Sequence, residues 1–136
     1  MIKGGCLCGQ VSYTADGEAA LVGVCHCKHC QKQSGSAFSI NLAVPRAALT
    51  ITSGDPAVYA DKGDSGAAVC RHFCRDCGSP LFSDAASLPQ WLILKAGTLD
   101  DPSRVKPDVN AWCKSAQPWT PHPEGVPRFH EGPSTT

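Results

Sequence analysis

The sequence lacks any long hydrophobic run, and it has no excess of either charge. No stretch approaches the ~20 consecutive apolar residues of a transmembrane helix, so we expect no membrane contact. Residues 1–6 lack the apolar segment of a secretion signal, so a cytoplasmic location is expected. The 12 basic and 12 acidic residues give a formal net charge of zero, which argues against nucleic-acid binding driven by bulk charge.

Long helices are also disfavoured, because 13 glycines and 11 prolines interrupt them and favour short strands joined by turns. Strands are predicted at 10–14, 20–25, 36–44, 49–52, 57–60, 69–73, 80–82, 91–96 and 109–113. One short helix is predicted at 28–34, ended by Gly35, and a further turn at 45–48. The length suits one mainly β domain at residues 1–131, followed by a flexible tail at 132–136.

Nine cysteines are the most informative feature of the composition. An odd number excludes complete internal disulfide pairing, and a reducing compartment makes metal binding the first interpretation. Seven of the nine lie in three groups: Cys6-x-Cys8, Cys25-x-Cys27-x-x-Cys30 and Cys74-x-x-Cys77. Two sulfurs on one tetrahedral zinc ion lie within ~4 Å of each other, and short C-x-C and C-x-x-C turns allow this.

The first and third groups form the simplest closed site, with Cys6, Cys8, Cys74 and Cys77 as four ligands. Such a site is structural because protein fills every position of the tetrahedron. A structural metal would also stabilise a chain of short strands that buries little area. A disulfide pair or reduced core thiols are the alternative interpretation of these cysteines.

The middle group supplies only three thiolates, Cys25, Cys27 and Cys30, which is the arrangement of a catalytic zinc with one open position. The alternative is a second closed site whose fourth ligand is Cys70, Cys113, His26 or His29. His26 and His29 flank the thiolates and could move protons near pH 7, but solvated side chains are the simpler expectation for both.

These motifs, taken in order, resemble the glutathione-dependent formaldehyde-activating enzymes and their relative, the centromere protein V domain. The matching segments are Gly5-Cys6-Leu7-Cys8-Gly9, Cys25-His26-Cys27-x-x-Cys30, Arg71-His72-Phe73-Cys74-x-x-Cys77-Gly78, Lys95-Ala96-Gly97-Thr98-Leu99-Asp100 and Pro118-Trp119. The resemblance covers nearly the whole chain. Asn110 and Cys113 depart from the residues usual in the family, and both precede Trp119, so they bear on the substrate pocket.

The resemblance implies a fold of several small coiled antiparallel β-sheets around structural zinc, shared with zinc-binding chaperones of Rab GTPases. It implies the same two zinc sites as the spacing, one structural and one catalytic and labile. It also implies a carbon–sulfur lyase that joins glutathione, or another small thiol, to formaldehyde. The oligomeric state is left open.

Two other functions fit the cysteine pattern. One is a zinc-stabilised binding module without catalysis, which an exposed apolar patch would favour. The other is a metal-linked thiol redox sensor, which requires Cys70 or Cys113 within disulfide reach of the open site.

Overall fold

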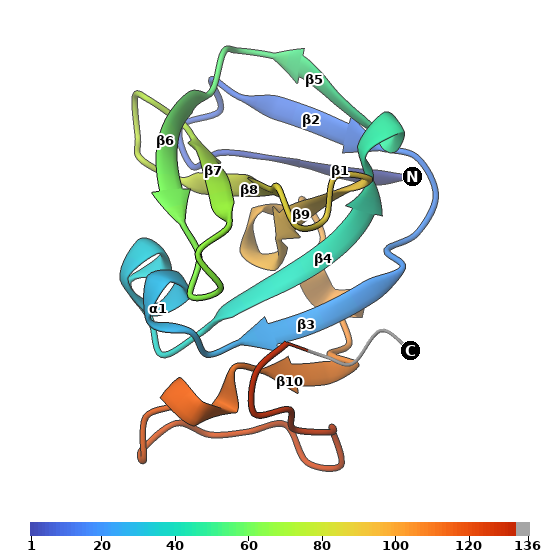
Figure 1. Ribbon diagram of the computed structural model, residues 1–136. Coiled ribbons are helices and arrows are strands. Elements are labelled where there is room, and N and C mark those ends of the chain that lie inside the picture. Colours follow the sequence, from blue (N-terminus) through green and yellow to red (C-terminus); the bar gives the residue numbers. More distant parts are fainter. Residues whose placement is uncertain (133–136) are drawn as a thin grey trace.

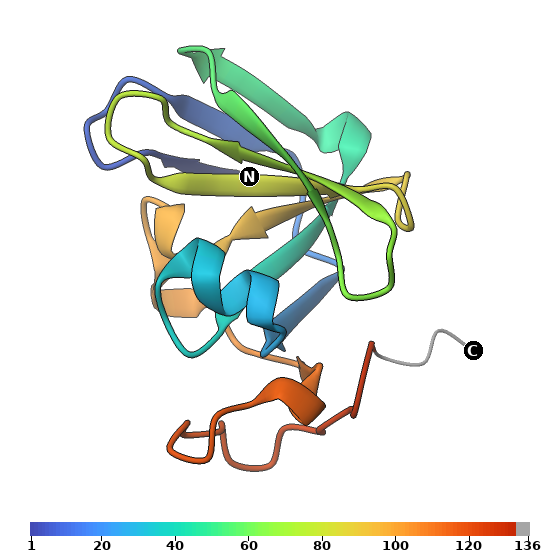
Figure 2. The same cartoon turned by 60° about the vertical axis from the view of Figure 1, so that its left-hand side comes forward.

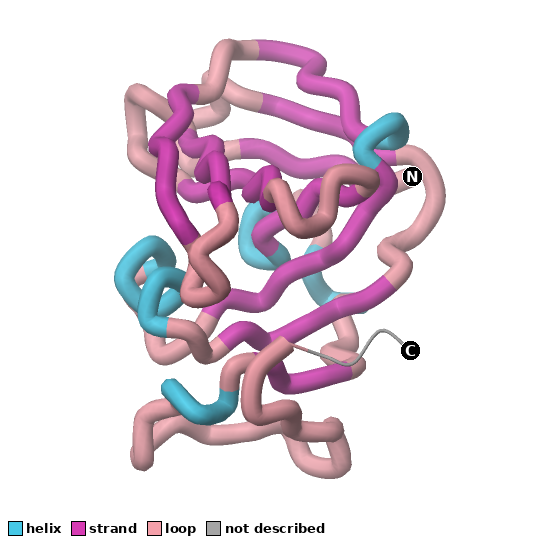
Figure 3. Tube along the Cα trace, viewed as in Figure 1, coloured by secondary structure: helices cyan, strands magenta, loops and turns pink. Residues whose placement is uncertain are grey.

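Short strands account for most of the regular structure in the computed structural model, which describes residues 1–132 (Figure 3). The strands are β1 (Ile2–Gly5), β2 (Ser12–Ala15), β3 (Leu21–Cys25), β4 (Ser39–Pro45), β5 (Leu49–Ser53), β6 (Ala57–Lys62), β7 (Ala68–Phe73), β8 (Pro80–Ala85), β9 (Trp91–Lys95) and β10 (Val109–Ala111). The helices are α1 (Lys28–Ser34) and four 3-10 turns, η1 (Arg46–Ala48), η2 (Ala96–Thr98), η3 (Pro102–Arg104) and η4 (Cys113–Ser115). The predicted mainly β class is confirmed; of the predicted tail at 132–136, all but Gly132 lies outside the described residues.

The strands form two sheets, one of three strands in the order β1-β2-β5 and one of seven in the order β10-β3-β4-β9-β8-β7-β6. In Figure 1 the three-stranded sheet lies at one end of the molecule and the C-terminal segment at the other. Pairing is antiparallel, as expected, except that β10 runs parallel to β3. Within the described residues no helix has the length and hydrophobicity needed to cross a lipid bilayer.

The seven-stranded sheet has one apolar face and one polar face. Residues paired directly across strands point to the same side of a sheet. Leu42, Leu94 and Phe82 are paired in this way, and all three belong to the main hydrophobic core. The register places a second set on the opposite side: Cys25, Ser39, Asn41, Arg71, Ser83 and Lys95. We call this second side the polar face.

Helix α1 follows the predicted bounds because both of its ends are fixed by local chemistry. Cys27 is the N-cap, and its sulfur accepts a hydrogen bond from the backbone N–H of Cys30. Gly35 ends the helix in the left-handed conformation, with φ of 67°, which favours glycine. Figure 2 shows α1 beside the loop that joins β6 to β7, so the helix brings its cysteines close to that hairpin.

The N-terminal strand packs too closely against its neighbours to accept a side chain at Gly4. A Cβ atom there would meet the Tyr13 hydroxyl and the Thr98 carbonyl oxygen, whereas at Gly97 it would meet nothing within 4 Å. We therefore expect Gly4→Ala to lower the free energy of unfolding by about 1–3 kcal/mol. Gly97→Ala is the matched control and should leave urea unfolding nearly unchanged. Equal stability of the two variants would contradict this packing.

Candidate metal centres

Two distant turns bring Cys6, Cys8, Cys74 and Cys77 together. The first two lie in the turn between β1 and β2, and the others in the turn between β7 and β8. The Cys6 and Cys8 sulfurs are 3.6 Å apart, and the Cys8 and Cys74 sulfurs 3.7 Å apart. All four sulfurs lie within 4.8 Å of one another. Tetrahedral zinc with bonds of ~2.3 Å places its sulfurs ~3.8 Å apart, whereas a disulfide would place two of them ~2.05 Å apart.

Hydrogen bonds hold this four-cysteine group in place. The backbone N–H of Val11 donates to the Cys6 sulfur at 3.2 Å, and that of Leu7 donates to the Ser79 hydroxyl at 3.0 Å. The Ser79 hydroxyl also lies 3.2 Å from the Cys77 sulfur. Hydrogen bonds from the side chain and then the backbone of Ser79 lower the pKa of Cys77 to about 5, which favours a thiolate. Four thiols at this spacing fit the donor set of a closed structural zinc site.

The second group contains Cys25 at the end of β3, Cys27 as the helix cap and Cys30 in the first turn of α1. Their sulfurs also lie within 4.8 Å of one another, and Cys27 and Cys30 are buried. Across residues 1–132, no further histidine, cysteine or carboxylate joins this three-cysteine group at that spacing. The alternative of a closed site therefore lacks a fourth ligand. Three thiols without a fourth fit a zinc site with one open position.

Two buried cations act on the three-cysteine group from the polar face. Arg71 and Lys95 are each 6% exposed. Hydrogen bonds from the thiols of Cys25 and Cys27, followed by the positive charges of Lys95 and Arg71, hold the pKa of Cys30 far below its ordinary value. Hydrogen bonds with Cys27 and Cys30 raise the pKa of Cys25, so Cys30 is the first of the three thiols to ionise.

The two flanking histidines take different positions. His26 is fully buried, so the expectation of a solvated side chain is wrong. Its Nε2 lies 3.0 Å from Asn110 Oδ1, and its ring packs 4.8 Å from that of His122. His29 is partly exposed, and its Nδ1 lies 2.9 Å from Asp61 Oδ2.

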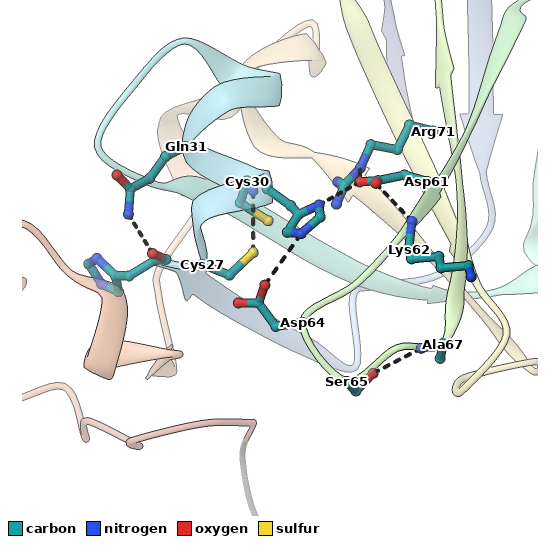
Figure 4. A network of polar contacts seen from close by, with 11 residues as sticks. Cys27, Cys30, Gln31, Asp61, Lys62, Asp64, Ser65, Ala67 and Arg71 are labelled. Atoms are coloured by element: carbon teal, nitrogen blue, oxygen red, sulfur yellow. Dashed lines mark hydrogen bonds and ion pairs between the residues drawn. The ribbon is translucent and has the colours of Figure 1, made fainter.

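Asp61 pairs with both His29 and Arg71, as the dashed lines in Figure 4 show. Arg71 donates through Nε to Asp61 Oδ2 at 2.8 Å, and Asp64 Oδ1 lies 3.4 Å from His29 Nε2. His29, Asp61 and Arg71 line a pocket of about 490 Å³, together with Lys28, Lys32, Gln33 and Tyr59. A larger pocket of about 580 Å³ adjoins Cys6, and none of the three cysteines lines either pocket.

Residues 1–115 match the sequence model of a known family, the glutathione-dependent formaldehyde-activating enzymes. The chain belongs to this family. A Penicillium rubens protein named "Putative glutathione-dependent formaldehyde-activating enzyme" is 38% identical over 77 residues, which are 57% of this chain and 39% of that protein. A protein of the same name from Aspergillus flavus is 37% identical over 82 residues, with 57% and 40% covered. The chain thus spans about two fifths of the length of these curated relatives.

A Rhodobacter sphaeroides protein of known crystal structure has the same fold as this chain. The two superimpose with a TM-score of 0.61 at 20% identity, covering 93% of this chain and 99% of the other. At this identity the likeness concerns the fold alone.

The sequence did not indicate that Arg71, Lys95 and Asp61 would lie around the three cysteines. Their place depends on strand register, and the only sequence signal was that Arg71 and Lys95 lie in family motifs. Asn110 was expected to bear on the substrate pocket. It is fully buried, and its Oδ1 lies 3.0 Å from Nε2 of His26, the residue between Cys25 and Cys27.

Cys70 and Cys113 belong to neither cysteine group. Cys70 precedes Arg71 on β7 and therefore points away from the polar face. Of the two partners that the redox-sensor interpretation allows, only Cys113 then remains. Large exposed apolar side chains, which a binding module would gather on one surface, come from separate segments: Met1, Leu7, Leu21, Val58, Tyr59, Leu88 and Trp119.

Proposed function

We propose that residues 1–131 form one zinc-dependent carbon–sulfur lyase domain that joins a small thiol of the glutathione class to a small aldehyde such as formaldehyde. The observation that carries this proposal is the three-cysteine group, which has no fourth protein ligand among residues 1–132 and lies beside a pocket. Cys25, Cys27 and Cys30 would hold the catalytic zinc, and Cys6, Cys8, Cys74 and Cys77 the structural one. Membership of the enzyme family supports this assignment.

The chemistry is the formation of one carbon–sulfur bond. A zinc ion at the three cysteines would supply the positive charge that keeps a substrate thiol ionised at neutral pH. The thiol sulfur adds to the aldehyde carbon, the carbon–oxygen double bond becomes single, and the oxygen takes a proton. Of the two flanking histidines, only His29 lines the pocket, which supports His29 as the donor of that proton.

The pocket beside α1 suits a thiol that carries carboxylates. Lys28, Lys32 and Arg71 line it, and glutathione-type thiols carry negative charge away from their sulfur. Asp61 accepts from Arg71 and so fixes the direction of its guanidinium group. We place the activity in the cytoplasm, where thiols stay reduced.

Two measurements on protein purified without chelator test the proposed function. We expect two zinc ions per chain, one of which is labile in the presence of glutathione. We also expect the protein to accelerate exchange between formaldehyde and its glutathione adduct, measured by NMR magnetisation transfer. A single zinc ion unaffected by glutathione, together with an uncatalysed exchange rate, would refute the enzyme and favour a zinc-stabilised binding module.

A further inference from the structure

Lys95 is a buried cation without a carboxylate partner. Its side chain is on the polar face at the end of β9, and it is 6% exposed. Its Nζ donates to Ser39 Oγ at 2.8 Å and to Asn41 Oδ1 at 3.2 Å, and both acceptors are neutral. In the part of the chain that the structure describes, no carboxylate lies within ion-pair distance of this ammonium group. Burial lowers the pKa of this ammonium group, and negative charge on Cys30 opposes that shift, so an anion at the cysteines favours the protonated form of Lys95.

The three-cysteine group is the source of that counter-charge. Ser39, which accepts from Lys95, is the cross-strand partner of Cys25 on β3. Such partners have their Cβ atoms about 5 Å apart. The side chain of Ser39 therefore lies between the ammonium group of Lys95 and the side chain of Cys25. Arg71, the other buried cation, is already paired with Asp61. Arg71 thus divides its interactions between Asp61 and Cys30, whereas Lys95 interacts with the cysteines and has no carboxylate partner among the described residues.

The charge count explains why such a residue is needed. Three thiolates and one zinc ion carry a net charge of −1, and a fourth thiolate makes it −2. In a buried site this second negative charge is strongly unfavourable unless a cation lies nearby.

We propose that Lys95 is the counter-ion that makes the site of Cys25, Cys27 and Cys30 select an anionic fourth ligand, a thiolate, over a neutral one. This inference rests on the proposed function, because it requires a metal at the three cysteines. Lys95 is a positioning residue in this account: its charge stabilises the bound thiolate, and it takes no part in bond formation.

The test uses cobalt-substituted protein, whose absorption reports the ligands of the metal. Wild type, Lys95→Gln and Lys95→Met are titrated with 2-mercaptoethanol, which binds as a thiolate, and with imidazole, which binds neutral. Glutamine keeps a donor for Ser39 and Asn41 and removes only the charge. Lys95→Met is the second variant, to be used if the Lys95→Gln protein does not fold. We expect thiolate affinity to fall about 10- to 100-fold in either variant while imidazole affinity is unchanged.

Controls separate charge from structure. Lys95→Arg keeps the positive charge and should retain thiolate affinity, and Lys106→Met removes an exposed lysine and should change nothing. An equal loss of affinity for 2-mercaptoethanol and for imidazole, or an unchanged affinity for the thiolate, would overturn the role of Lys95. Wild-type protein that binds no thiolate at all would instead refute the proposed function, and this inference with it.

Discussion

Replacement of Cys8 by serine is expected to leave the protein largely unfolded at 25 °C. Structural zinc contributes ~10–16 kcal/mol in small zinc modules, which is comparable to the ~5–15 kcal/mol total stability of a typical domain. Cys8 is exposed, so the substitution removes almost no packing, and the loss would report the metal alone. Circular dichroism, urea unfolding and zinc content measured on the same sample would test this.

Cys70→Ser is the matched control for the Cys8 variant. Cys70 is half-buried on β7 and belongs to neither cysteine group, so we expect a change of about 1 kcal/mol or less and an unchanged zinc content. A Cys8→Ser protein with native stability and two zinc ions would show that the four-cysteine group does not stabilise the fold through a metal.

Replacement of Cys27 by serine is expected to reduce formaldehyde–glutathione exchange to the uncatalysed rate while the fold is kept. The sulfur of Cys27 accepts from the backbone N–H of Cys30 and so caps α1. Serine is among the best N-cap residues, so the helix keeps its cap and only the thiolate is lost. Zinc content should fall from two ions per chain to one, because two thiolates make a poor site.

The Cys27 variant needs a control outside both groups, and Cys113→Ser provides one. Cys113 lies in η4, and we expect its replacement to leave both zinc content and exchange rate unchanged. Full exchange activity in Cys27→Ser would rule out the three-cysteine group as the catalytic centre. Loss of activity together with unfolding would assign Cys27 a structural role instead.

Local chemistry made α1 predictable, because its cap residues are sequence neighbours. Strand β1 was missed, since Gly4 and Gly5 weaken a strand signal and the strand depends on its pairing with β2. The strand predicted at 109–113 ends earlier, at Ala111, because Trp112 adopts a left-handed conformation with φ of 56°. No sequence pattern predicts that a tryptophan will adopt this conformation.

The cysteine groups could be proposed from spacing because ligands of one metal must lie close together, and the structure brings the same sets together. Their surroundings could not be proposed in this way. Arg71 and Lys95 become buried only once β7 and β9 pair with their neighbours, and lysine and arginine are ordinarily exposed. His26 differs from expectation for the same reason, because its partner Asn110 lies 84 positions away.

The distance between the two halves of the four-cysteine group has a consequence for the order of folding. Cys8 and Cys74 are 66 positions apart, and closing so long a loop carries an entropy cost that no local contact repays. The β6–β7 and β7–β8 hairpins are local and are expected to form early, whereas the N-terminal hairpin would join the β7–β8 turn only when a metal binds the four cysteines. The supply of zinc during synthesis, rather than the formation of the hairpins, would then limit the rate of folding.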